Sequence, residues 1–194
     1  MTDRTPQPSE TPKGRRRDRT GQPLAHDAPE PQGGFALEHD VETVQEALAL
    51  AQVVWNRGRY FEAHELLEHV WHHAPADERL FWQGVIQVAV AHVLGQRQRP
   101  EGVLRTLDKA MPKLVGVPDD HHGVDVPALR AQLQQAAERA ANGQPALEPP
   151  FPCGPGGVWF SRDDAPTVLS REAPWIVASR ALRERPPRNP SDGA

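Results

Sequence analysis

The fold is decided by the stretch FEAHELLEHVWHH, which covers residues 61–73. Its apolar residues recur at spacings of three and four, the pattern of a helix that buries one face. At 100° per residue, four of them share that face: Ala63, Leu66, Leu67 and Val70. Pro75 cannot continue a helix, so the sequence predicts a helix from Tyr60 to about His73.

The same periodicity continues on both sides of this segment. Before it, five apolar residues follow a helical stripe: Val41, Val44, Leu48, Ala51 and Trp55. Asp40 is a suitable N-cap for this first helix, and Gly58, which is free to adopt a left-handed conformation, follows its end. On the other side, Asp77 is expected to cap a third helix that ends near Gly95.

Two more helices complete the predicted core. The fourth begins near Pro100 and presents five apolar residues on one face: Val103, Leu104, Leu107, Met111 and Leu114. Pro112 lacks a backbone donor and is expected to kink or end this helix. Asp125 caps the fifth helix, which runs from Val126 to about Ala141. No part of the core alternates apolar and polar residues like a half-buried strand. The predicted fold is therefore all-α, a compact antiparallel bundle of about five helices with helix-pair packing.

The 21 prolines separate the chain into three regions, because they are dense near both ends and sparse between them. We predict a disordered arm over residues 1–40, a helical domain over 41–143 and a Pro/Gly-rich tail over 144–194. Segments of such composition bury too little apolar surface to offset their chain entropy. Two apolar islands in the tail, residues 158–160 and 175–178, each contain a tryptophan and are expected to dock on the core or, as the alternative, on a partner.

Composition argues against several classes of protein. No apolar run approaches the ~20 residues that span a bilayer, and no apolar segment follows the N-terminal positive charges as in a secretory signal. A single cysteine, Cys153, cannot form an internal disulfide or a cysteine-based zinc site. The formal charge of −4 gives no reason to expect nucleic acid, and the basic run over residues 13–19 is interpreted as a solvated tail. We expect a cytoplasmic protein with no membrane contact.

One edge of the 60–73 helix carries side chains suited to chemistry. His64, Glu68 and Trp71 border the buried face, whereas three others point towards solvent: Glu65, His69 and His72. The spacing resembles the H-E-x-x-H zinc motif, but Glu68 stands where that motif has its second histidine. A His64–Glu68 pair can chelate a metal across one helical turn only with a third ligand from elsewhere.

A second group of metal-ligand side chains lies in the loop before the fifth helix, Asp119-Asp120-His121-His122. It contains enough ligands for a surface cation, although we interpret it as a solvated loop. Elsewhere the sequence has no Gly-rich phosphate loop, serine nucleophile elbow or Cys/His pair. No cofactor is expected, and enzyme activity is not favoured.

The third predicted helix offers a matching polar stripe at Gln83, Gly84 and Gln87. If these residues face His64 and Glu68, the two amides complete a hydrogen-bond network that fixes how the two helices pack. The alternative is a small pocket that recognises a ligand at the same edge. We take the network as the expected arrangement, in which Glu68→Ala leaves buried donors unpaired and costs about 1–3 kcal/mol.

Two motifs resemble the signature of the domain-of-unknown-function 309 family. They read NRGRYFEAHELLEHVW over residues 56–71 and ERLFWQGVIQVAVAH over residues 78–92. The resemblance covers about residues 45–115 and the fifth helix, and it implies a small helical bundle, found in bacteria and plastids, without an established reaction. It singles out seven residues as a motif and binding edge: His64, Glu65, Glu68, Trp71, Gln83, Gly84 and Gln87.

These residues favour a non-catalytic protein-interaction or structural module over an enzyme. A helical groove readily accepts an amphipathic or extended segment. The expected partner is therefore another polypeptide or the chain's own C-terminal tail, with Trp175–Ala178 as the segment that folds back. The alternative function is a metal-binding protein or metal-dependent hydrolase that uses His64, Glu65 and Glu68.

Overall fold

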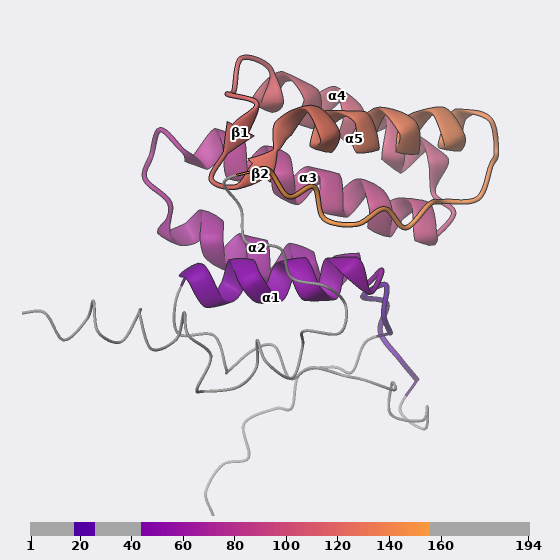
Figure 1. Cartoon of the computed structure of the whole chain (residues 1–194). Helices are drawn as coiled ribbons and strands as arrows, with labels where there is room; N and C mark the ends of the chain where they lie inside the picture. The colour runs from indigo at the N-terminus through magenta and orange to yellow at the C-terminus, as the bar shows by residue number, and fades with distance from the viewer. Residues whose placement is uncertain (1–17, 26–43, 156–194) are drawn as a thin grey trace, which may run out of the picture.

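Five α-helices and one short β-hairpin make up the described part of the chain (Figure 1). The computed structural model describes residues 18–25 and 44–155. The helices are α1 (Val44–Asn56), α2 (Tyr60–His73), α3 (Arg79–Gln96), α4 (Pro100–Leu114) and α5 (Val126–Ala141), and the strands are β1 (Asp120–His121) and β2 (Val124–Asp125). The all-α prediction is confirmed. The predicted Asp40 cap, the first residues of the first predicted helix and both tryptophan islands lie outside the described residues.

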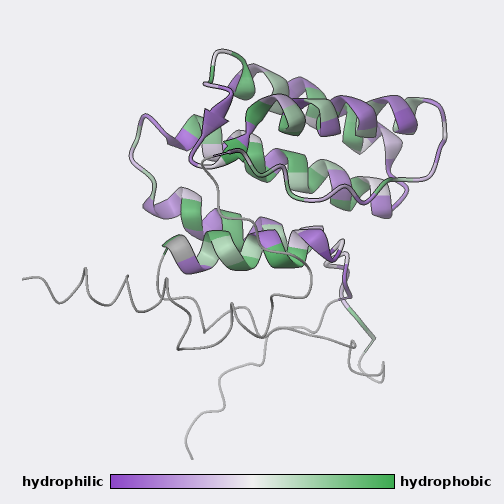
Figure 2. Cartoon of the chain, viewed as in Figure 1, coloured by the Kyte–Doolittle hydropathy of each residue, from purple (hydrophilic) through white to green (hydrophobic). Residues whose placement is uncertain are grey.

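Helix α3 lies between the other helices of the bundle. It packs against α2, α4 and α5, while α1 packs against α2 (Figure 1). Figure 2 shows α1 as largely hydrophobic and α4 and α5 as mixed, in keeping with the burial of most α1 side chains and one-sided burial of α4 and α5. Val53, Trp55 and Val88 are fully buried in the resulting core. None of the described helices is long and apolar enough to cross a membrane.

The helix ends follow the local signals in the sequence, with one exception. Asp125 caps α5 as predicted, because its side chain accepts a 2.8 Å hydrogen bond from the backbone N–H of Ala128. Gly58 takes a positive φ of 69° between α1 and α2. The predicted Asp77 cap is wrong. A turn that is closed by a hydrogen bond from the Glu78 N–H to the Pro75 carbonyl moves the start of α3 to Arg79.

Helix α4 begins at Pro100 as predicted and ends at Leu114, two residues beyond Pro112. Its buried face differs from the expected stripe, since Leu104 is 38% exposed. The smaller Thr106 and Ala110 are buried instead, together with two residues of the predicted stripe, Val103 and Leu114. Helix α4 packs against both α3 and α5, and small side chains allow helix backbones to approach closely.

The loop before α5 forms the β-hairpin, which the sequence did not predict. Asp120 pairs with Asp125 and His121 with Val124 in antiparallel register. The two turn residues, His122 and Gly123, have φ values of 52° and 76°, as required by a two-residue turn of type I′. A bridge between Val124 and Cys153 ties the hairpin to the chain that follows α5.

Residues 144–154, which the sequence places in the tail, pack on the bundle. In Figure 1 this segment (orange) runs back from the end of α5 towards β2. Phe151 is only 1% exposed and meets the Trp55 ring edge-on at a centroid distance of 5.4 Å. The Pro149 carbonyl accepts hydrogen bonds from Trp55 Nε1 at 3.1 Å and from the Tyr60 hydroxyl at 3.0 Å. The core therefore includes a residue from beyond the last helix.

Candidate functional site

His64, Glu65 and Glu68 form a cluster on the outer edge of α2. The His64 Nδ1 atom lies 3.1 Å from Glu65 Oε1, and its Nε2 atom lies 3.3 Å from Glu68 Oε1. The Phe61 ring stacks near the imidazole at a centroid distance of 6.0 Å. Both glutamate side chains are 46% exposed, so the cluster borders solvent rather than the interior of the bundle.

Among the described residues, the polar contacts of His64 and Glu68 stay within one helix. A neutral imidazole has a single N–H, so His64 donates to one carboxylate at a time unless both ring nitrogens are protonated. In the described part of the chain, His64 and Glu68 find their hydrogen-bonding and ionic partners on α2. Trp71 lies half-buried against the core, with its ring 4.7 Å from the ring of His72.

The polar stripe on α3 packs against α4 instead of α2. Lys113 Nζ donates a 3.0 Å hydrogen bond to Gln87 Oε1. Gly84 lies beneath Leu114, since a Cβ atom at Gly84 would come within 2.7 Å of the leucine Cδ2 atom. Gln83 is half-buried near the start of the same helix. The structure thus brings His64, Glu65 and Glu68 together, and the expected network with the two glutamines does not form among the described residues.

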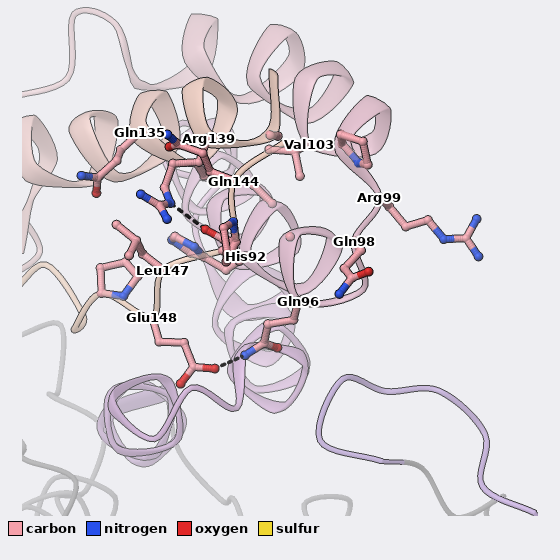
Figure 3. Close-up of a pocket in the computed structure, with 18 of the residues that line it drawn as sticks. His92, Gln96, Gln98, Arg99, Val103, Gln135, Arg139, Gln144, Leu147 and Glu148 are labelled. Atoms are coloured by element: carbon pink, nitrogen blue, oxygen red, sulfur yellow. Dashed lines mark hydrogen bonds between the residues drawn. The ribbon is translucent and has the colours of Figure 1, made fainter. Parts of the chain in front are cut away.

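A cavity of about 540 Å³ opens elsewhere, between the C-terminal half of α3, the start of α4, α5 and residues 144–149 (Figure 3). Its walls are rich in glutamine and arginine side chains. His92, from the most apolar stretch of α3, lies at its inner end. The cavity therefore has a buried polar floor within a mixed polar and apolar wall.

His92 is buried and neutral. Its side chain is 3% exposed and stacks on the Tyr60 ring at a centroid distance of 4.6 Å. The Trp55 ring meets it edge-on at 5.6 Å. Burial lowers the pKa of His92 to about 4, although the nearby Gln132 side chain opposes the shift, so the imidazole is uncharged near pH 7. The Gln132 side chain lies within reach of the ring, but His92 Nε2 makes no hydrogen bond of standard geometry in the described structure.

Two glutamine oxygens around His92 are also buried without a partner. They are Gln96 Oε1 and Gln132 Oε1, and the amide nitrogens of both residues are already used. Gln96 Nε2 donates to the Gly58 carbonyl at 2.7 Å and to Glu148 Oε1 at 2.9 Å. Gln132 Nε2 donates to the Pro150 carbonyl at 2.7 Å. Three of the six buried side-chain polar atoms without a partner among the described residues therefore line one cavity.

The mouth of the cavity carries more positive than negative charge. Its ionisable side chains, besides the neutral His92, are Arg19, Arg99, Arg139 and Glu148. Arg19 pairs with Glu148 at 3.1 Å, and Arg139 Nε donates a 2.6 Å hydrogen bond to the Pro145 carbonyl. Figure 3 shows Arg99 extending outwards at the rim. This balance favours an anionic group over a cationic one at the entrance.

The central part of the chain matches a known protein family. Residues 48–106 match the model of DUF309, a domain of unknown function. This match confirms the resemblance inferred from the two motifs. An uncharacterised protein of Aquifex aeolicus (strain VF5) is 29% identical to this chain over 101 residues, which are 52% of this chain and 30% of the relative. No solved structure gives a significant match.

The DUF309 match covers only part of the cavity. It includes His92 and Gln96, whereas Gln132 on α5 and the 144–154 segment lie outside it. The motif edge around His64 lies wholly inside the match. Sequence reasoning missed the cavity because its walls come from distant segments. One signal was present, since His92 interrupts the longest apolar stretch of α3.

Proposed function

We propose that this domain is a non-catalytic module that binds a short acidic polypeptide segment in the cavity between α3, α4, α5 and residues 144–149. The observation that carries the proposal is the group of unpaired buried atoms: His92 Nε2, Gln96 Oε1 and Gln132 Oε1. A buried polar atom without a partner costs about 1–3 kcal/mol. The His92 and Gln132 side chains lie within reach of each other, yet none of the three atoms makes a hydrogen bond of standard geometry, which favours a site where a bound molecule supplies one.

The unpaired atoms define the chemistry of the ligand. The two glutamine oxygens can only accept hydrogen bonds, and the neutral imidazole of His92 can take either role according to its tautomer. Backbone N–H groups of a polypeptide are donors of the required kind. The excess of arginine at the mouth favours an acidic side chain, and a cavity of about 540 Å³ lies within the ~300–1,000 Å³ typical of ligand sites.

A binding role is favoured over catalysis by the lining of the cavity. No hydroxyl, thiol or lysine side chain lines it in the described residues. Its groups of nucleophilic type are Glu148, which is paired with Arg19, and the buried His92. The cytoplasmic location expected from the sequence is part of this proposal, since the lone Cys153 fits a reducing compartment. A partner polypeptide was also the expectation from the sequence.

The test uses the full chain labelled with ¹⁵N and two capped tetrapeptides as probes. One peptide alternates aspartate with alanine, and the other has lysine in place of aspartate. We expect the aspartate peptide to shift the side-chain amide signals of Gln96 and Gln132 in a saturable manner, and the lysine peptide to leave them unchanged. Equal responses to the two peptides, or no response to either at millimolar concentration, would overturn the proposal.

A matched pair of variants locates the binding. His92→Phe removes one unpaired atom and keeps a ring against Tyr60, so the affinity for the aspartate peptide should fall about tenfold for one lost hydrogen bond. Glu65→Gln changes a charge on the outer edge of α2 and should leave the affinity unchanged. A loss of binding in Glu65→Gln with retention in His92→Phe would move the peptide site to the α2 edge.

Metal binding at His64, Glu65 and Glu68 is the second candidate function. Ligand atoms of all three side chains lie within 4.8 Å of one another. However, Glu65 contacts Nδ1 and Glu68 contacts Nε2, so the carboxylates lie against different ring nitrogens. One ion reaches all three ligands only after a side chain moves, which makes this candidate the weaker one. Loss of zinc binding in His64→Asn would support it.

A further inference from the structure

We propose that Glu78, His121 and His122 form a binding site for a divalent transition-metal ion, with Zn²⁺ as the best fit. Glu78 Oε2 lies 2.7 Å from His121 Nε2 and 3.1 Å from His122 Nε2. Ligand atoms of the three residues lie within 4.8 Å of one another. This site is separate from the cavity and from the His64 cluster, and the proposal does not depend on either.

The three ligands converge because two distant segments meet here. Glu78 is the N-cap residue of α3, and the two histidines belong to the hairpin more than forty residues later. The Phe81 ring meets His121 edge-on at a centroid distance of 4.6 Å. The Trp82 ring stacks on His122 at 5.5 Å with an interplanar angle of 26°. Aromatic packing thus restrains both imidazoles before any ion is bound.

The hairpin backbone is anchored on its other side. The Gly154 N–H donates to the Gly123 carbonyl at 2.9 Å, and the Asp125 N–H donates to the Pro152 carbonyl at 2.9 Å. His122 occupies the first position of the turn with φ of 52°, where asparagine is the usual residue. Histidine is among the non-glycine residues enriched at positive φ, so His122 suits the turn while its ring lies beside Glu78.

The ligand set and its spacing fit a transition metal. Two imidazole nitrogens with one carboxylate oxygen are a common set for zinc with an open fourth position, and for non-haem iron. With bonds of about 2.0–2.2 Å, neighbouring ligand atoms in a tetrahedral site lie about 3.3 Å apart. The 3.1 Å contact is already close to that spacing, and the 2.7 Å contact needs to open by about 0.6 Å. The His122 side chain is 45% exposed, which leaves access for water as a further ligand.

The experiment separates a metal site from a set of hydrogen bonds that merely fastens the hairpin. Full chain without a histidine tag is stripped with a chelator and titrated with ZnCl₂ by calorimetry, and with CoCl₂ for its visible spectrum. His122→Asn is the decisive variant, because asparagine suits the turn and keeps the hairpin while it removes one ligand. His64→Asn is the matched control, since it removes a histidine from the other cluster.

We expect one Zn²⁺ per chain and a Co²⁺ absorption spectrum typical of four ligands. The zinc affinity should be at least about 100-fold lower in His122→Asn and in Glu78→Gln, because even changes to residues outside the ligand set lower metal affinity about 10–100-fold. His64→Asn should bind zinc like the original chain. The proposal is overturned if the original chain binds no zinc below millimolar concentration. It is also overturned if His122→Asn, shown to be folded by circular dichroism, binds zinc with unchanged affinity, or if His64→Asn alone abolishes binding.

Discussion

Acidification is expected to destabilise the fold through the buried His92. Burial lowers its pKa from an ordinary 6.5 to about 4, so between these values the unfolded chain binds a proton that the folded chain does not. The contribution of the neutral His92 to the free energy of unfolding is complete above about pH 6.5 and is lost as the pH falls towards 4. At about 1.4 kcal/mol per pH unit, the loss amounts to about 3 kcal/mol at pH 4. For a chain of this size that is a large part of the total stability.

The assay is urea unfolding of the full chain at several pH values from 7 to 4.5, compared with His92→Phe. The variant keeps a ring against Tyr60 but has no proton to bind. Other buried groups titrate in the same range, and Glu62 acts with the opposite sign because burial raises its pKa. Their contributions cancel in the difference between the two proteins, which isolates the contribution of His92.

We expect the free energy of unfolding of the original chain to fall by about 2.5 kcal/mol more than that of His92→Phe between pH 7 and pH 4.5. Leu80→Ala, which changes an exposed side chain without a titratable group, serves as the control and should follow the original chain. Parallel curves for the original chain and His92→Phe would refute the reasoning, because they would mean that His92 is not buried as a neutral group.

Three further substitutions test the packing. Phe151→Ala should destabilise the fold by about 3–5 kcal/mol, measured by urea unfolding, because the side chain is 1% exposed within the core. Gly84→Ala should lower the melting temperature at a cost of about 1–3 kcal/mol, because its Cβ would press on the buried Leu114. Glu68→Ala should change the free energy of unfolding by less than about 0.5 kcal/mol, since its only described ionic partner, His64, lies one turn away on the same exposed edge. A loss above about 1 kcal/mol would instead support the buried hydrogen-bond network expected from the sequence.

The helices are predictable because their signals are local. Helix α2 spans Tyr60–His73 and α5 spans Val126–Ala141, as the periodicity and the flanking Pro75 and Asp125 indicate. The cap of α3 is not predictable in this way. Asp77 is a good cap by residue type, but the turn that precedes α3 and the contacts of Glu78 with the hairpin histidines decide where the helix begins.

Tertiary partners were harder to predict than helix faces. A helical wheel correctly places His64 and Glu68 beside the buried face of α2, and Gln83, Gly84 and Gln87 on one stripe of α3. It does not say which helix each stripe meets, and the α3 stripe meets α4 through Lys113 and Leu114. Phe151 was missed for a related reason, because proline-rich flanks suggest an unstructured tail although one aromatic side chain can fix such a segment to a core.

The 144–154 segment connects the two sites proposed here. Its Pro149 end borders the cavity near His92, and its Gly154 end is bonded to the hairpin that carries His121 and His122. Along α3, His92 and Glu78 are fourteen residues apart, or about 21 Å at 1.5 Å per residue. A substitution inside the segment, such as Phe151→Ala, would therefore disturb both sites together. His92→Phe and His122→Asn act at opposite ends and leave the segment intact, so loss of peptide binding in one and loss of zinc binding in the other are independent results.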